Sequence, residues 1–271
     1  AYFLAKTGHS VTVIERDSIG SHASGFAYGS LSPLGEAGQA EDILPELEIA
    51  RMGMDIHTQF SRELFESTGI KTDHRFRPAL DLTFTASEAT KAKKQVEWRT
   101  DEKGYRVKWL SSEEALQVNP HISKEILGAV YTEGVADVEP YKLLLALTQA
   151  CELLGVDIVH GDVSGVIRKG TTITITTQSG LRTCDNLVLA MGPWMGKTAE
   201  WLGIEVPITP LKGQIVRLNA PNVTVNCSVG WQGNYACTKP DGLLWAGTTE
   251  ENVGFNDIPT TNGRDQILEA L

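Results

Sequence analysis

Two helix–strand units constrain the fold of this chain more than any other feature of its sequence. In the first, a helical composition over residues 1–8 leads into a β-branched strand over about residues 10–14. In the second, an apolar helix over residues 141–154 leads into a strand over residues 156–160. A glycine separates helix from strand in both units, as is common where a helix ends in a tight turn. This order predicts an α/β domain with helices packed on a parallel sheet.

Shorter helices and strands fill the rest of the chain. Further helical patterns cover residues 41–67, 87–103, 111–119 and 260–271. Strand patterns cover residues 80–84, 163–167, 171–177, 186–190, 215–218, 234–239 and 243–247, and the run at 186–190 is expected to be buried. The last three predict an antiparallel sheet, so the expected fold is α/β: a Rossmann-like domain with a mixed parallel sheet, and an α+β domain with an antiparallel sheet. The Gly- and Ser-rich stretch at 18–38 shows no periodicity and is expected to be a functional loop.

Charge and composition exclude several classes of protein. The 34 acidic and 24 basic residues give a formal charge of −10, which is the wrong sign for a general nucleic-acid binder. The longest apolar runs, at 143–147 and 187–191, are far shorter than the roughly 20 residues of a transmembrane helix. The four cysteines form no CxxC pair and the six histidines are dispersed, so no metal site is predicted. We expect reduced thiols and a cytoplasmic location.

Both ends of the chain look like cut ends. The sequence begins without an initiator Met, inside the helical composition of residues 1–8, and its last helical pattern ends at Leu271 with no cap. We therefore expect an internal fragment of a longer protein.

The acid that ends the first strand is a candidate cofactor residue. In a dinucleotide-binding unit, a Gly-rich turn presents helix N–H groups to a pyrophosphate, and an acid about 20 residues later accepts hydrogen bonds from the ribose. Glu15 occupies the place of that acid, and the glycine turn would then lie before Ala1. Because acids also end strands where no ligand binds, the residues alone leave both interpretations open.

Five segments in one order carry a resemblance to a known family. They are His22-Ala-Ser-Gly-Phe-Ala-Tyr-Gly-Ser-Leu-Ser-Pro33, Gly134-Val-Ala-Asp-Val-Glu-Pro-Tyr141, Leu187-Val-Leu-Ala-Met-Gly-Pro-Trp194, Val206-Pro-Ile-Thr-Pro-Leu-Lys-Gly-Gln214 and the stretch at 235–248. Together they resemble the FAD-dependent amine and D-amino-acid oxidoreductases, the superfamily of glycine oxidase, D-amino-acid dehydrogenase, sarcosine oxidase and D-amino-acid oxidase. The glycine oxidase type is the most similar, and the resemblance covers essentially all of the chain.

The resemblance implies a set of cofactor-binding residues. Glu15 would hold the adenosine ribose, with Arg16 beside it, and the backbone of Val163 would meet the adenine. The loop that passes the pyrophosphate and the flavin ring would contribute Ala23, Ser24, Tyr28, Gly29 and Ser30, and the strand end over the cofactor would contribute Ala190, Gly192 and Trp194. The cofactor implied is FAD, bound noncovalently.

The resemblance also implies a reaction. Tyr235 would lie at the amino-acid site, while the arginine that pairs with the substrate carboxylate and a last Gly-rich flavin contact would lie beyond Leu271. The flavin would take a hydride from glycine, sarcosine or a D-amino acid, and water would hydrolyse the resulting imine to an oxo acid. Oxygen and a membrane quinone are both open as electron acceptors, and a homo-oligomer or a peripheral membrane association is open as well.

The expected domains are intertwined along the chain. Residues 1–70 and 139–207 would form the FAD-binding domain, and residues 71–138 and 208–271 the substrate domain. Two alternative functions stay open: a flavin-fold binding or assembly subunit, and a tRNA-modifying flavoprotein relative, although the acidic charge disfavours the second.

Overall fold

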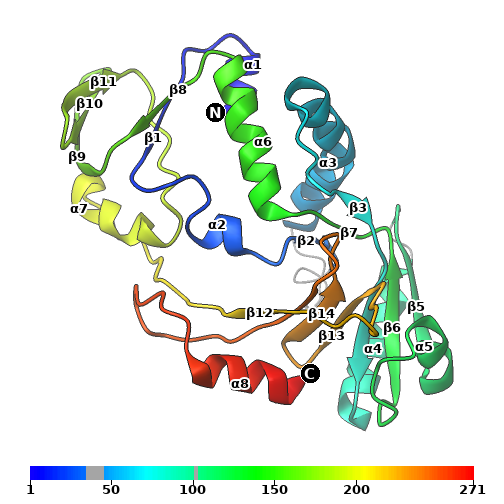
Figure 1. The fold of residues 1–271 in the computed structure, drawn as a ribbon. Coiled ribbons are helices and arrows are strands. Elements are labelled where there is room, and N and C mark those ends of the chain that lie inside the picture. The colour runs from blue at the N-terminus through cyan, green and yellow to red at the C-terminus, as the bar shows by residue number, and fades with distance from the viewer. Residues whose placement is uncertain (35–45, 101–102) are drawn as a thin grey trace. The chain divides into compact units, whose positions relative to one another are not determined.

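A computed structural model describes residues 1–34, 46–100 and 103–271 (Figure 1). By its internal contacts the chain divides into two compact units. The first unit comprises Ala1–Phe26, Leu144–Lys212 and Glu250–Ile258. The second unit comprises Ala27–Leu143, Gly213–Thr249 and Pro259–Leu271. The assignment of residues 1–70 and 139–207 to a cofactor domain stays a prediction.

The first unit contains the strands of both predicted helix–strand units. Helix α1 (Tyr2–Lys6) precedes β1 (Thr12–Glu15), and α6 (Pro140–Leu153), which passes from the second unit into the first, precedes β8 (Asp157–His160). Strands β1 and β8 pair in parallel. The glycines after the two helices have φ values of 88° and 78°, a left-handed conformation that favours glycine and ends a helix. The predicted parallel arrangement is confirmed.

A three-stranded antiparallel sheet follows in the first unit. It consists of β9 (Val163–Lys169), β10 (Thr172–Thr177) and β11 (Gly180–Cys184) in the order β11-β10-β9. The hairpin of β9 and β10 was predicted from its alternation and its Lys169-Gly170 turn. Strand β11 was not predicted, because its largely exposed residues give no hydrophobic alternation.

The predicted buried strand at 186–190 is wrong. This segment has no strand structure, and Val188 in it is 73% exposed. An apolar run becomes a strand only where a neighbouring strand completes its backbone hydrogen bonds, and no described residue pairs with this segment. It leads into the 3-10 helix η2 (Gly192–Thr198) and helix α7 (Ala199–Leu202).

The second unit is built on a seven-stranded sheet. Its strands are β4 (Ala79–Thr83), β5 (Arg106–Ser111), β6 (Gly128–Glu133), β12 (Ile215–Leu218), β13 (Ser228–Trp231), β14 (Asn234–Thr238) and β15 (Leu244–Gly247). The order is β12-β15-β14-β13-β4-β6-β5, and every pair is antiparallel except β13 and β4. The predicted α/β class, with a parallel pair and a largely antiparallel second sheet, is confirmed.

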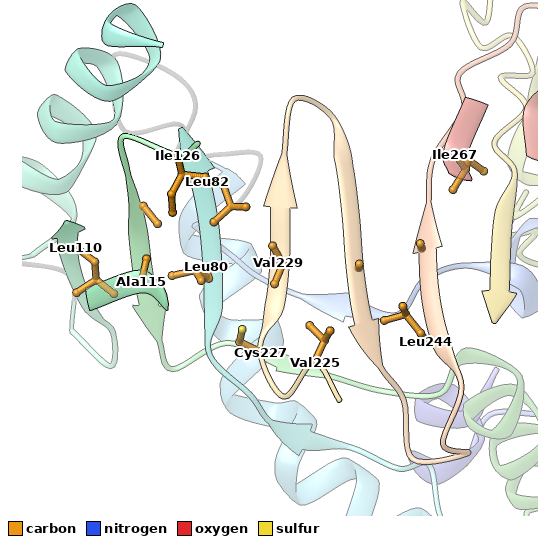
Figure 2. Packing of buried hydrophobic residues seen from close by; sticks show 13 residues of the cluster. Leu80, Leu82, Leu110, Ala115, Ile126, Val225, Cys227, Val229, Leu244 and Ile267 are labelled. Atoms are coloured by element: carbon orange, nitrogen blue, oxygen red, sulfur yellow. The ribbon is translucent and has the colours of Figure 1, made fainter. Parts of the chain in front are cut away.

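Helices cover both faces of this sheet. On one face, residues of β4, β13, β14 and β15 pack with Ala115 of α5 (Ser112–Val118) and Ile267 of α8 (Thr261–Ala270), as Figure 2 shows. On the other face, Val107 and Val130 pack with Ala92 of α4 (Ala86–Arg99). The side chains of Tyr235, Cys237 and Lys239 alternate with the core residue Ala236 and therefore lie on this second face.

The remaining elements are helices and a small sheet. Helix α3 (Glu46–Thr68) confirms the predicted helix at 41–67, except for residues 41–45, which are not among the described residues. Residues 101–102 of the predicted helix 87–103 are not described either. The loop at 18–38 contains α2 (Ala23–Phe26) and β2 (Ser30–Leu31), and its last four residues are not among those described. Strands β2, β7 (Ala136–Asp137) and β3 (Arg75–Phe76) form a small sheet. In the described part of the chain, no helix combines the length and apolar character needed to cross a bilayer.

Candidate functional site

In the first unit, the carboxyl ends of β1 and β8 bring two of the predicted site residues to one edge. Glu15 pairs with His160 in the parallel register, and its backbone oxygen accepts a hydrogen bond from the Gly161 N–H at 2.8 Å. Val163 follows two residues later at the start of β9. Oε1 of Glu15 accepts a hydrogen bond from the Asp17 N–H at 2.9 Å, whereas Oε2 has no hydrogen bond to a described residue. Glu15 therefore keeps one carboxylate oxygen available for a ligand.

Arg16 and Trp194 also lie together in the first unit. The guanidinium carbon of Arg16 lies 4.6 Å from the centre of the Trp194 ring, and its Nε donates to Oδ2 of Asp17 at 2.9 Å. His22 Nε2 lies 2.8 Å from the same Asp17 oxygen, and its ring meets Trp194 edge-on at 4.9 Å. Hydrogen bonds from His22 and then from Arg16 lower the pKa of Asp17. The side chain of Arg16 is thus fixed between a carboxylate and an aromatic ring.

A segment distant in the sequence extends this stack. The Phe255 ring lies parallel to Trp194, with 5.4 Å between the ring centres, and Nζ of Lys197 lies 5.5 Å from the centre of Phe255. The backbone of Lys212 pairs with that of Glu251, and its Nζ donates to the Ile258 carbonyl at 2.7 Å. The Phe255 segment is therefore held beside Trp194 by contacts at both of its ends.

The other predicted residues of the first unit lie outside this stack. Ala23 and Ser24 are exposed in α2, and Ala190 and Gly192 are exposed around the start of η2. Gly25 of α2 approaches the Gly20 carbonyl so closely that a Cβ atom would lie 1.9 Å from its oxygen. Only glycine allows this close backbone approach.

The second unit brings together Tyr28 and Tyr235. Their ring centres are 4.0 Å apart with an angle of 42° between the planes, and the Tyr28 hydroxyl lies 3.2 Å from Ser228 Oγ. Gly29 has φ of 81°, and a Cβ atom there would lie 2.2 Å from the Val138 carbonyl oxygen.

The residues beside Tyr235 in the sheet are glycines, which leave room for its ring. Its two register neighbours in the sheet are Gly230 and Gly247, and a Cβ atom on Gly247 would lie 2.9 Å from the Tyr235 hydroxyl. Burial raises the pKa of Tyr235, and a side-chain hydrogen bond with Thr248 opposes this rise. Like any tyrosine at neutral pH, its hydroxyl is protonated and can donate a hydrogen bond.

A buried cluster of charges next to Tyr28 was not predicted. Asp137, whose side chain is 3% exposed, accepts hydrogen bonds from Arg75 Nε at 3.1 Å, from Arg77, and from Lys239 Nζ at 2.9 Å. Ser30 and Arg75 are the register partners of Asp137 in β2 and β3. Three cations therefore share one carboxylate, and the Lys239 ammonium lies 4.7 Å from the centre of the Tyr28 ring.

One sequence signal could have found part of this cluster. Tyr235, Cys237 and Lys239 take alternate positions of the predicted strand 234–239, so a lysine follows a predicted site residue on the same face. Asp137 and the two arginines give no comparable signal, because their contact joins strands that are far apart in the sequence.

Comparisons with known proteins give the family and the fold of the chain. A family model described as "FAD dependent oxidoreductase" matches residues 1–271. Glycine oxidase of Bacillus subtilis (strain 168) is 24% identical, and the match covers 99% of this chain and 71% of that protein. Hydrogen cyanide synthase subunit HcnC of Pseudomonas aeruginosa is 28% identical over 81% of this chain and 54% of its own length. The crystal structure of glycine oxidase from Geobacillus kaustophilus superposes with a TM-score of 0.94 at 25% identity, covering 99% of this chain and 72% of that one.

Proposed function

Because the chain belongs to the FAD-dependent oxidoreductase family, we propose that it oxidises the C–N bond of a small amino acid or amine. Glycine, sarcosine and D-amino acids are the proposed substrates. The observation that carries the proposal is the similarity to glycine oxidases, which extends over 99% of the chain in sequence and in structure. The Tyr28–Tyr235 pair offers a protonated hydroxyl and aromatic surface, which suit a small polar substrate.

The residues at the edge of β1 and β8 fit the adenosine part of FAD. Glu15 has a free carboxylate oxygen for ribose hydroxyls, and Val163 begins β9 three residues after β8 ends. The same proposal assigns Arg16, Ala23, Ser24, Ala190, Gly192 and Trp194 in the first unit, and Tyr28, Gly29 and Ser30 in the second, to cofactor binding. It also assigns residues 1–70 and 139–207 to the FAD-binding domain.

The protein's own residues would orient the substrate. FAD, when bound, accepts the hydride that leaves the substrate carbon, while the substrate nitrogen loses a proton. Tyr235 would hold the substrate by a hydrogen bond from its hydroxyl, so the C–H bond points in one direction. The product imine takes up water and gives an oxo acid and an amine or ammonia, and oxygen or a quinone takes the two electrons. A cytoplasmic location belongs to the same proposal and is supported by the four free thiols.

Replacing Glu15 by glutamine should weaken FAD binding about 10- to 100-fold, because hydrogen bonds to a charged group contribute about 1.5–3 kcal/mol. Glutamine keeps an oxygen for the Asp17 N–H, so the strand end should stay intact. Fluorescence titration of the apoprotein with FAD measures the affinity. The exposed Glu152 in α6 provides the control variant Glu152→Gln, which should bind as the parent does. Equal FAD affinities for the parent and both variants would show that Glu15 does not bind the cofactor.

The substrate class can be tested by product analysis. The FAD-loaded protein is incubated with glycine, sarcosine or D-alanine, with oxygen or a soluble quinone as acceptor. Glyoxylate should form from glycine and sarcosine, or pyruvate from D-alanine, together with ammonia or methylamine. A protein that retains FAD but oxidises none of the three with either acceptor would contradict the proposed substrates and favour the role of a binding or assembly subunit.

A further inference from the structure

We propose that Lys239 is a positioning residue that fixes Tyr235 through the ring of Tyr28. The inference rests on the proposed function only in so far as Tyr235 contacts substrate. Its structural part, that the ammonium of Lys239 holds the two tyrosine rings in place, can be tested without any substrate.

The contacts form a continuous path. Nζ of Lys239 lies 4.7 Å from the centre of the Tyr28 ring, and the Tyr28 ring centre lies 4.0 Å from that of Tyr235. A cation over an aromatic face attracts the ring, and the attraction is stronger where water is excluded. Lys239 is itself held by the Asp137 carboxylate at 2.9 Å. Displacing the ammonium would therefore remove the contact on the face of the Tyr28 ring, leave its hydroxyl at Ser228, and allow the ring that packs on Tyr235 to move.

Lys239 is the third cation on a carboxylate that two arginines, Arg75 and Arg77, already neutralise. The Lys239 side chain is 1% exposed, and burial lowers its pKa below the ordinary 10.5. The charged form is thus destabilised in the folded protein. A buried ammonium that lies 4.7 Å from the Tyr28 ring, beside a candidate site, points to a functional role.

The charged groups around Lys239 come from several elements. Burial has the largest effect on its pKa and lowers it, Cys237 of β14 and Asp137 of β7 raise it, and Arg77 after β3 lowers it. The centre of the Trp245 ring of β15 lies 5.4 Å from Nζ of Lys239. The guanidinium carbon of Arg217 of β12 lies 3.7 Å from the centre of the same ring. Since the unfolded chain binds the lysine proton more tightly, stability should rise with pH between the lowered pKa and 10.5, and Lys239→Met should remove that rise.

The variant Lys239→Met keeps the length of the side chain and removes its charge. We expect an unchanged or higher melting temperature, because Asp137 keeps both arginines. We expect the NMR signals of Tyr28 and Tyr235 to shift and broaden in protein with 13C-labelled tyrosine, and the six tyrosines allow assignment by Tyr→Phe variants. In the FAD-loaded enzyme, KM for the amine should rise roughly three- to tenfold with little change in kcat, the size expected for an aromatic contact.

Lys93 provides a matched control. Its Nζ lies 4.7 Å from the Trp109 ring, the same distance as in the Lys239–Tyr28 contact, but it is exposed on α4. Lys93→Met should leave the tyrosine signals and KM unchanged. Tyr28→Leu should raise KM as Lys239→Met does, and the double variant should show little further increase, because both act through one contact.

The outcomes separate the inference from the proposed function. A lower melting temperature with unchanged tyrosine signals would show that Lys239 is structural and would overturn the inference. Shifted tyrosine signals with an unchanged KM would overturn its link to substrate. A parent enzyme that no amine reduces would contradict the proposed function, while the tyrosine signals would still decide whether Lys239 positions the rings.

Discussion

Replacing Asp137 by alanine is expected to destabilise the protein by about 3–5 kcal/mol, the usual range when one partner of a buried ion pair is removed. Arg75, Arg77 and Lys239 would then repel one another with no carboxylate between them, and the Arg77 and Lys239 side chains are only 4% and 1% exposed. Lysine can lose its proton under this stress, whereas arginine cannot. Removing the lysine charge as well, in Asp137→Ala/Lys239→Met, should therefore recover part of the lost stability.

Urea denaturation at pH 7 measures both effects. Glu66 provides a control, since its pair with Arg62 is exposed on α3 and spaced i,i+4. Glu66→Ala should change the free energy of unfolding by no more than about 0.5 kcal/mol. A loss of less than 1 kcal/mol in Asp137→Ala would mean that water reaches Arg77 and Lys239, and their description as buried would be wrong.

Gly29→Ala should cost about 2–5 kcal/mol, the sum of two effects. The left-handed φ of 81° costs a non-glycine residue roughly 1–2 kcal/mol, and overpacking costs about 1–3 kcal/mol. A Cβ atom would lie 2.2 Å from the Val138 carbonyl oxygen and 2.9 Å from the ring of Pro140. The segments cannot separate freely, because the Val138 N–H donates to the Gly29 carbonyl at 2.9 Å.

Gly69 separates these two effects. Its φ is 72°, and nothing lies within 4 Å of the position that a Cβ atom would take. Gly69→Ala should therefore show the cost of the φ angle alone, roughly 1–2 kcal/mol, in the same denaturation experiment. If both alanine variants lost the same stability, the close approach at Gly29 would have no energetic weight.

Local features were predicted well from the sequence. The helix ends at Gly8 and Gly155, and the capping box of Ser111 with Glu114, depend on residues a few positions apart, so their pattern is readable along the chain. Strands β14 and β15 alternate between two faces and are joined by a Pro-Asp-Gly turn, which also is local information.

Features that depend on partners distant in the sequence were not predicted. The run at 186–190 is apolar enough for a strand, but strand formation also needs a neighbour, which the segment itself does not encode. Strand β13 was missed because Ser228 and Gly230 interrupt its apolar pattern, and its parallel pairing with β4 joins positions about 150 residues apart.

The candidate site shows the same division. The resemblance named Glu15, Arg16, Trp194, Tyr28 and Tyr235, and the structure brings the last two into contact, as it does Arg16 and Trp194. The partners that hold them were not predicted: Phe255 beside Trp194, and Asp137 with its three cations beside Tyr28. Those partners come from other strands and loops, and only folding places them there.

The most direct test of the proposed reaction is anaerobic reduction of the FAD-loaded protein. Visible spectra are recorded while glycine, sarcosine and D-alanine are added in turn without oxygen, so that only electrons from the amine can bleach the flavin band. Bleaching by at least one of these amines, in proportion to the amount added, is the predicted result. A flavin band that stays unchanged with all three, yet disappears with a chemical reductant, would contradict the account.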